Sequence, residues 1–197
     1  TVSFELTPMV SITGMTRFHV NALSPEIQIY CSPVNFHPMN PVLPISYPKA
    51  FAMKLAESIG YYKTLGWATD TWAFDEGRLP SSVFLEDLHY TLDQETKMFE
   101  YMLQRPSSLL IDVFMETDRV QHMFWRLIDT EHPAYNAAEA AKYGDAILHV
   151  YQKADAIVGK ALAAADANTD LFVISDHGFH SFRQALNTNT FLARNGY

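Results

Sequence analysis

Two short apolar runs, at residues 109–115 and 171–174, constrain the fold of this chain more than any other feature. Each run is bounded by polar residues, and a continuous apolar run of this length predicts a parallel strand that is covered on both faces. Helical patterns precede and follow the runs, so helix and strand alternate from residue 48 onward. This alternation predicts an α/β fold with a mostly parallel sheet flanked by helices.

Apolar residues at helical spacing predict helices at residues 48–59, 81–104, 118–128, 137–165 and 188–195. The longest of these carries one apolar stripe, which is typical of core packing rather than of a cofactor site. The stripe consists of Tyr143, Ile147, Val150, Tyr151, Ala154, Val158 and Leu162.

The N-terminal part of the chain has a different texture. Apolar or β-branched runs at residues 2–6, 15–20 and 26–30, separated by Thr13-Gly14 and Ser24-Pro25, predict a small antiparallel meander. Five prolines between Pro33 and Pro48 predict a loop or extended linker, because proline fixes φ and removes a donor. We therefore divide the chain into a β-rich insertion with its linker, residues 1–47, and a partial α/β core with insertion helices, residues 48–197.

The composition limits the partners. A net charge of −8 provides no basic stripe, which argues against a nucleic-acid polymer or an anionic membrane as a partner. No apolar run approaches the ~20 residues that a membrane span needs. The single cysteine, Cys31, excludes an internal disulfide and indicates a reducing, cytoplasmic compartment. The chain begins at Thr1 without a Met, and we expect it to be an internal piece of a longer protein.

The first apolar run leads into an acid and a histidine, Asp118 and His122. At four residues apart on a helix their side chains point roughly 40° from each other, so both can hold one metal ion. The alternative is structural: Asp118 is an acid in a first helical turn, and His122 is satisfied by it.

The second run ends at Ser175-Asp176-His177-Gly178, where Gly178 allows the backbone to turn tightly. Taken alone, this turn fits a metal ligand pair and a structural turn equally well. Ligands of open α/β sheets bind beyond the carboxyl ends of the strands, and both pairs lie there. Together they predict a site for two divalent ions, zinc or else manganese, although four ligands do not complete two ions.

Two blocks of the sequence resemble a known family. Residues 116–125, which read Glu-Thr-Asp-Arg-Val-Gln-His-Met-Phe-Trp, are followed by Asp129 and by residues 132–135, His-Pro-Ala-Tyr. The second block is Ser-Asp-His-Gly-Phe at residues 175–179, followed by Phe182-Arg183 and Gly196-Tyr197. Over residues 45–197 these blocks resemble type I phosphodiesterases/nucleotide pyrophosphatases of the alkaline phosphatase superfamily, and most of all its predicted phosphohydrolase or phosphomutase group.

The resemblance implies roles for the four candidate ligands. Asp118 and His122 match ligands of one ion, and Asp176 and His177 match two ligands of the other. The family site also has an Asp and a Thr or Ser nucleophile, which we expect before Thr1, and a His, which we expect after Tyr197. The chain then lacks the attacking group, and we expect it to be inactive alone.

Other residues are weaker candidates. Arg119 and Arg183 carry guanidinium groups that match phosphate oxygens, the alternative being solvated surface arginines. His132 and His180 are candidates for supporting the metal site or approaching the substrate. In residues 67–80, Trp67, Trp72 and Phe74 either stack on a substrate or, as we prefer, pack the insertion onto the core.

The sequence thus predicts part of a two-metal phosphohydrolase or phosphodiesterase that acts on a small phosphorylated substrate. A phosphomutase of the same superfamily is one alternative. A metal-independent interaction domain, in which both pairs are structural, is the other.

Overall fold

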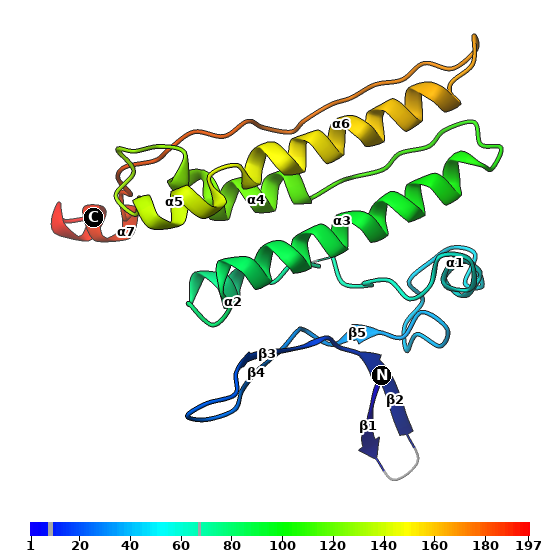
Figure 1. Ribbon diagram of the computed structural model, residues 1–197, viewed down its shortest axis with the longest axis horizontal. Helices are drawn as coiled ribbons and strands as arrows, with labels where there is room; N and C mark the ends of the chain where they lie inside the picture. Colours follow the sequence, from blue (N-terminus) through cyan, green and yellow to red (C-terminus); the bar gives the residue numbers. More distant parts are fainter. Residues whose placement is uncertain (8–9, 67) are drawn as a thin grey trace.

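The structure is a computed structural model that describes residues 1–7, 10–66 and 68–197, with only the backbone of Leu6 and Val10. Its described elements form layers: the strands lie on one side of the long helix α3, and α4 and α6 lie on the other (Figure 1). The C-terminal segment runs along α6 on the side away from α3 (Figure 1). Helices, not a sheet, therefore form the centre of the molecule.

The N-terminal strands form two separate antiparallel sheets. In one, β1 (Val2–Thr7) pairs with β2 (Val10–Met15), and β2 pairs with β5 (Asn35–Phe36). In the other, β3 (Phe18–Ala22) pairs with β4 (Gln28–Cys31). The prediction of strands is confirmed here, but a single meander with a strand at 15–20 is wrong. The chain breaks at Thr16, whose hydroxyl donates to the Ser32 carbonyl at 2.7 Å.

The predicted helices form within a few residues of their expected ends, with two exceptions. The range 137–165 is broken near Gly144 into α5 and α6, because the backbone of Asp145 leaves the helical region with φ −87° and ψ 3°. A short helix that was not predicted, α2, is capped by Asp70, whose carboxylate accepts from the Ala73 N–H at 3.0 Å. The helices are α1 (Phe51–Ile59), α2 (Thr71–Asp75), α3 (Ser81–Leu103), α4 (Glu116–Phe124), the 3-10 turn η1 (Trp125–Leu127), α5 (Ala137–Tyr143), α6 (Ala146–Ala164) and α7 (Thr188–Arg194).

The main core lies where α3, α4 and α6 pack together. At its centre the rings of Phe74, Phe84 and Phe124 lie 4.6–5.9 Å apart. Each ring of this size contributes about 1.5–3 kcal/mol by leaving water. On α6 the predicted apolar stripe is partly wrong, since Tyr151 and Leu162 are exposed. The fully buried positions of that helix are Ala146, Val150, Ile157 and Ala161.

The described residues do not show the predicted parallel sheet. Residues 109–114 and 171–174 are not helical, but no strand is assigned there and neither segment pairs with another in the described chain. In the first segment, Leu110 and Phe114 pack on the helices while Leu109 and Ile111 face solvent. That alternation is typical of a strand, but a strand also needs a backbone partner, and no described segment provides one.

Polar contacts join the N-terminal region to the helical layer. Arg17 forms an ion pair with Asp87 at 2.7 Å. Tyr30 donates to Asp70 at 2.7 Å, and Asn21 donates to the Arg78 carbonyl at 3.2 Å. Among the described helices, none has the length and apolar character to cross a membrane.

Candidate functional site

Helix α4 places the first predicted pair. Asp118 lies in its first turn, where an acid interacts favourably with the helix dipole. His122 lies one turn later, and its Nε2 is 3.3 Å from Asp118 Oδ1. Asp118 is mostly buried and His122 half exposed, so the pair opens toward solvent on one side.

The extended segment after residue 174 brings the second pair to the same place. His177 Nε2 is 3.7 Å from Asp118 Oδ1, the same oxygen that faces His122. Asp176 is exposed, and its Oδ2 lies 3.8 Å from His177 Nε2. The fold therefore brings together side chains that are far apart in the sequence, with Asp118 at the centre.

Phe179 packs against both histidines. Its ring lies 4.7 Å from the ring of His122 and 5.6 Å from that of His177. On its other side it lies 5.9 Å from the indole of Trp125. Spacing alone did not identify Phe179 or Trp125 as parts of the site, although both lie inside the two blocks that carry the family resemblance.

A second set of contacts, which we call the Asp129 clamp, holds the segment after Phe179. Ser181 donates to Asp129, and Arg183 donates to the same carboxylate at 2.7 Å. The Trp125 indole N–H donates to Ser181 Oγ at 2.9 Å. The hydrogen bonds from Ser181 and Arg183 lower the pKa of Asp129 to about 2.

The charge state of His177 follows from its neighbours. The carbonyl of Gly178 raises the pKa of its imidazole, and the carboxylates of Asp176 and Asp118 add to this effect. A metal ion binds the neutral imidazole, so it competes with a proton at His177.

The chemistry of these donors fits a divalent ion such as zinc, which binds imidazole nitrogen and carboxylate oxygen. The imidazole nitrogens of His122 and His177 converge on one carboxylate oxygen of Asp118. As placed, however, no group of three or more His, Cys, Asp or Glu side chains in the described residues is arranged to hold a metal ion. The donor types fit, and the coordination sphere is incomplete.

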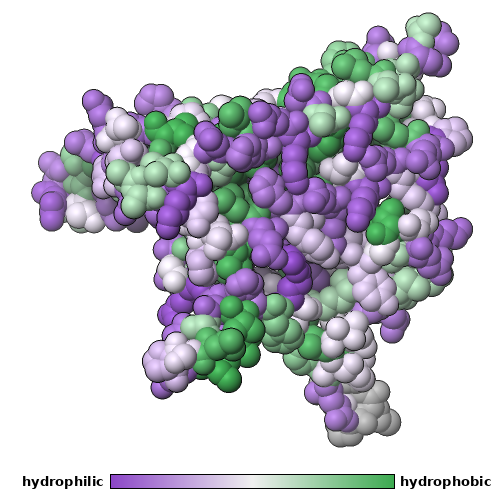
Figure 2. Space-filling view, in the orientation of Figure 1, coloured by the Kyte–Doolittle hydropathy of each residue, from purple (hydrophilic) through white to green (hydrophobic). Residues whose placement is uncertain are grey.

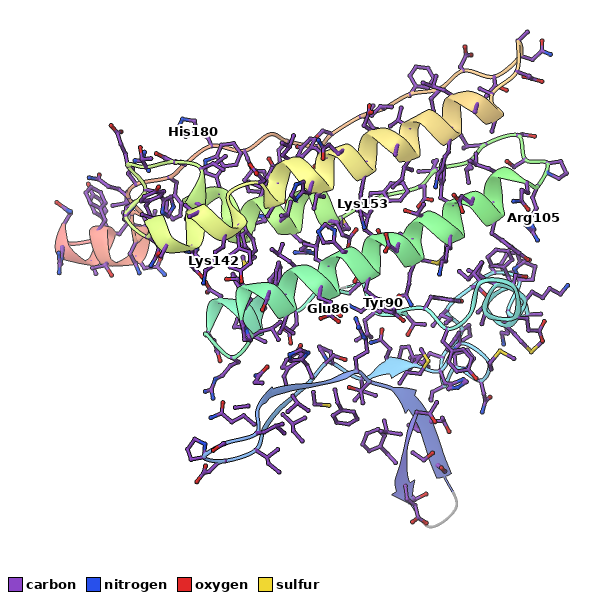
Figure 3. The ribbon with its side chains drawn as sticks, in the orientation of Figure 1. Glu86, Tyr90, Arg105, Lys142, Lys153 and His180 are labelled. Carbon is purple, nitrogen blue, oxygen red and sulfur yellow. The ribbon has the colours of Figure 1, made fainter. Side chains whose placement is uncertain are left out.

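The weaker candidates lie in different surroundings. Arg119 is buried, so the alternative that it is a solvated surface arginine is wrong. Its Nη1 lies 3.8 Å from Asp118 Oδ2. Arg183 is engaged in the Asp129 clamp. His132 Nδ1 accepts from the Ala134 N–H at 3.0 Å. His180, labelled in Figure 3, lies near the end of the helical layer, with Nδ1 2.6 Å from the Ser181 carbonyl oxygen.

The aromatic residues of the insertion divide between core and surface. Phe74 packs into the ring cluster of the core, as predicted for packing of the insertion, whereas Trp72 is exposed. Trp67 lies outside the described residues.

The comparisons with known proteins first identify a class, the family of enzymes that hydrolyse phosphate esters. The chain belongs to the type I phosphodiesterase/nucleotide pyrophosphatase family, whose model matches residues 18–197. This confirms the resemblance seen in the two sequence blocks and extends it into the N-terminal strands. No curated protein and no solved structure matches the chain significantly.

Proposed function

We propose that this chain carries the two half-sites of a two-metal phosphohydrolase or phosphodiesterase, with Asp118 and His122 on one ion and Asp176 and His177 on the other. One observation supports this most strongly: the Nε2 atoms of His122 and His177 both lie within 3.7 Å of Asp118 Oδ1. Zinc is the preferred ion and manganese the second choice, because oxygen and imidazole donors suit both.

Two such ions, when bound, stabilise the attacking and leaving oxygens of a phosphoryl transfer. The chain's own contribution is positioning. Asp118 holds the two imidazoles, Phe179 limits their rotation, and the Asp129 clamp keeps the second half-site beside the first. The substrate is a small phosphorylated compound.

We also propose that the chain alone has little or no activity. A catalytic zinc ion has three protein ligands, and four side chains supply only two for each of two ions. A weak metal site without an attacking hydroxyl leaves the phosphorus atom without an activated nucleophile.

Calorimetric titration with zinc and with manganese tests the metal site. We expect zinc to bind, and His177→Asn and Asp118→Asn each to weaken binding by about 10–100-fold, because each removes a donor. His149→Asn is the matched control, since His149 lies exposed on α6. X-ray absorption at the zinc edge should show imidazole among the ligands.

The outcomes separate the alternatives. Zinc affinity that is absent, or equal in all variants, contradicts the metal site and favours the interaction domain. For activity, we expect a nitrophenyl phosphate ester to be cleaved near the uncatalysed rate by the zinc-loaded chain. Rapid release of phosphate contradicts the proposed inactivity, and transfer to an added alcohol instead of water favours the phosphomutase.

A further inference from the structure

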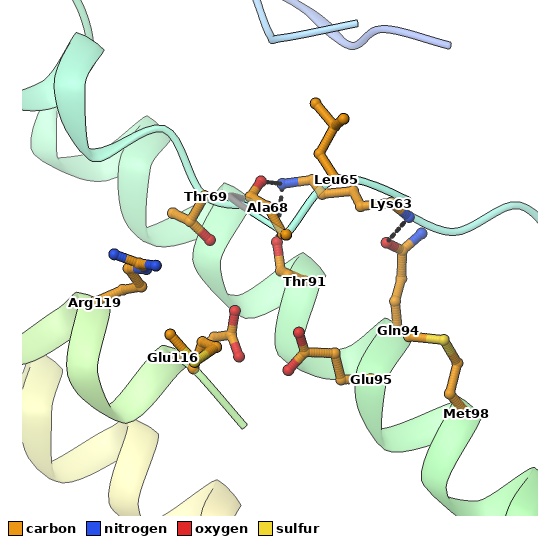
Figure 4. A pocket seen from close by; sticks show the side chains of 12 residues that line it. Lys63, Leu65, Ala68, Thr69, Thr91, Gln94, Glu95, Met98, Glu116 and Arg119 are labelled. Atoms are coloured by element: carbon orange, nitrogen blue, oxygen red, sulfur yellow. Dashed lines mark hydrogen bonds between the residues drawn. The ribbon is translucent and has the colours of Figure 1, made fainter. Parts of the chain in front are cut away.

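A cavity of about 200 Å³ lies between α3, the first turn of α4 and the loop that precedes α2 (Figure 4). It is on a different side of α4 from the metal half-sites. Glu116 lines the cavity, and Asp118 follows it by two residues, which places their side chains roughly 200° apart around a helix. The family site does not include this cavity, so its polar lining needs a separate explanation.

The lysine of the cavity has no hydrogen left for a ligand. Lys63 Nζ donates to the Ala68 carbonyl at 2.6 Å, to Asp87 Oδ2 at 2.6 Å and to Thr91 Oγ1 at 2.9 Å. An ammonium group has three donors, so all of them are used. Lys63 therefore provides no binding group for an anion.

Three side-chain oxygens of the cavity, in contrast, lack partners. Thr69 Oγ1, Glu95 Oε2 and Glu116 Oε2 are all buried and accept no hydrogen bond. Thr69 and Glu116 are each only 1% exposed, and in Figure 4 their oxygens point into the same space. A buried polar atom without a partner costs about 1–3 kcal/mol, so three together indicate that something binds them.

We propose that this cavity binds a hydrated divalent cation of the magnesium type, held by Glu95, Glu116 and Thr69. These three residues come from α3, α4 and the preceding loop, and they offer only oxygen. Magnesium prefers oxygen, is held by one or two carboxylates and keeps several waters. A cavity of about 200 Å³ has room for a cation with several waters.

The charges around the cavity favour the same ion. Lys63 is already paired with Asp87, so its single positive charge only partly offsets the two acids Glu95 and Glu116. A divalent cation neutralises both. Without the cation, burial and the nearby Glu116 raise the pKa of Glu95 to about 10, so a proton takes part of that role.

Titration with magnesium chloride tests the proposal on the full chain. We expect Glu95→Gln to weaken magnesium binding at least about tenfold, since it removes a charged ligand and keeps the shape. Glu86→Gln is the matched control, because Glu86 is an exposed acid on the same helix (Figure 3). His149→Asn, at an exposed position of α6, should also leave magnesium affinity unchanged.

A second variant and a spectroscopic measurement test the site even if Glu95→Gln does not fold. Thr69→Val should weaken binding by a smaller factor, and manganese should broaden the amide NMR signals of Thr69 and Glu95 in the unmodified chain. The proposal is overturned if the folded chain binds no magnesium at about 10 mM. It is also overturned if Glu95→Gln binds like the unmodified chain, or if His149→Asn abolishes binding.

Discussion

Among single residues, Glu95 on α3 shows most directly how burial changes an acid. Burial is the largest cause that raises its pKa to about 10, followed by the hydrogen bond and the negative charge of Glu116. The folded chain therefore binds a proton that the unfolded chain releases near pH 4.5. The stabilisation from this proton is fully present below about pH 4.5 and is lost as the pH rises toward 10.

In the absence of added metal, we expect Glu95→Gln to raise the free energy of unfolding at pH 8 by about 1–3 kcal/mol. The amide keeps the shape of the protonated acid and has no charge to bury. At pH 5 the gain should nearly vanish. Urea unfolding at the two pH values measures the difference, with the exposed Glu86→Gln as control. Equal effects at both pH values contradict the raised pKa.

How much of the site was predictable also depends on individual residues. Asp118 and His122 are one helical turn apart, so local spacing was enough to predict that they meet. Glu95 and Glu116 lie on different helices, and only the packing of α3 against α4 brings them together. The Asp129 clamp is of the same kind, since its partners come from segments more than fifty residues apart in the sequence.

At the scale of elements, the C-terminal segment is held by side chains rather than by backbone. Among the described residues, 170–186 take part in no backbone–backbone hydrogen bond. The Asp129 clamp and Phe179 are its main attachments to η1 and α4. The position of His177 therefore depends on a few side chains.

We expect Asp129→Asn to increase hydrogen exchange in residues 176–183 by about tenfold, because charged hydrogen bonds become neutral ones. Exchange measured by mass spectrometry should show the change there and not in α3. Glu131→Gln is the control, since Glu131 is exposed and lies 4.0 Å from Arg183. The pKa of Asp129 is lowered, so the clamp should persist above pH 4 and be lost as the pH falls through about 2. Unchanged exchange in Asp129→Asn contradicts this role for the clamp.

The break between α5 and α6 provides another test at this scale. A Cβ at Gly144 would lie 2.6 Å from the Ala140 carbonyl oxygen, whereas a Cβ at Gly159, in the middle of α6, meets nothing within 4 Å. We expect Gly144→Ala to lower the free energy of unfolding by about 1–2 kcal/mol, and Gly159→Ala to raise it by up to about 1 kcal/mol. Thermal unfolding of both variants measures the effects, and effects of the same sign contradict this account.

Helices were predicted more accurately than strands for a physical reason. The hydrogen bonds of α3 and its apolar face are local, so periodicity and end signals determine them. Whether residues 109–115 form a strand depends on another segment lying beside them, which the segment itself does not encode. Leu110 and Phe114 still pack on the helices without a sheet, and the ring of Phe114 lies 5.8 Å from that of Phe99.

For the whole molecule, the lack of a parallel sheet among the described residues leaves a helical core and exposed apolar side chains on the segments around it. Phe172 and Ile174 are 80% and 89% exposed. Figure 2 shows hydrophobic side chains along the edge where this segment runs, and again on the β3–β4 hairpin. Apolar surface of this kind promotes association between molecules.

This arrangement distinguishes the helical fold from the parallel sheet that the sequence predicts. In the helical fold, the double variant Phe172→Ser, Ile174→Ser should change the free energy of unfolding by less than about 0.5 kcal/mol, because neither side chain leaves a core. It should also reduce light scattering at high concentration.

In a covered sheet, each replacement would instead cost about 2–5 kcal/mol. Phe84→Ala, at a fully buried position, should cost about 3–5 kcal/mol in either case and shows that the measurement detects core loss. A large loss in the double variant would therefore contradict the helical fold and restore the sheet.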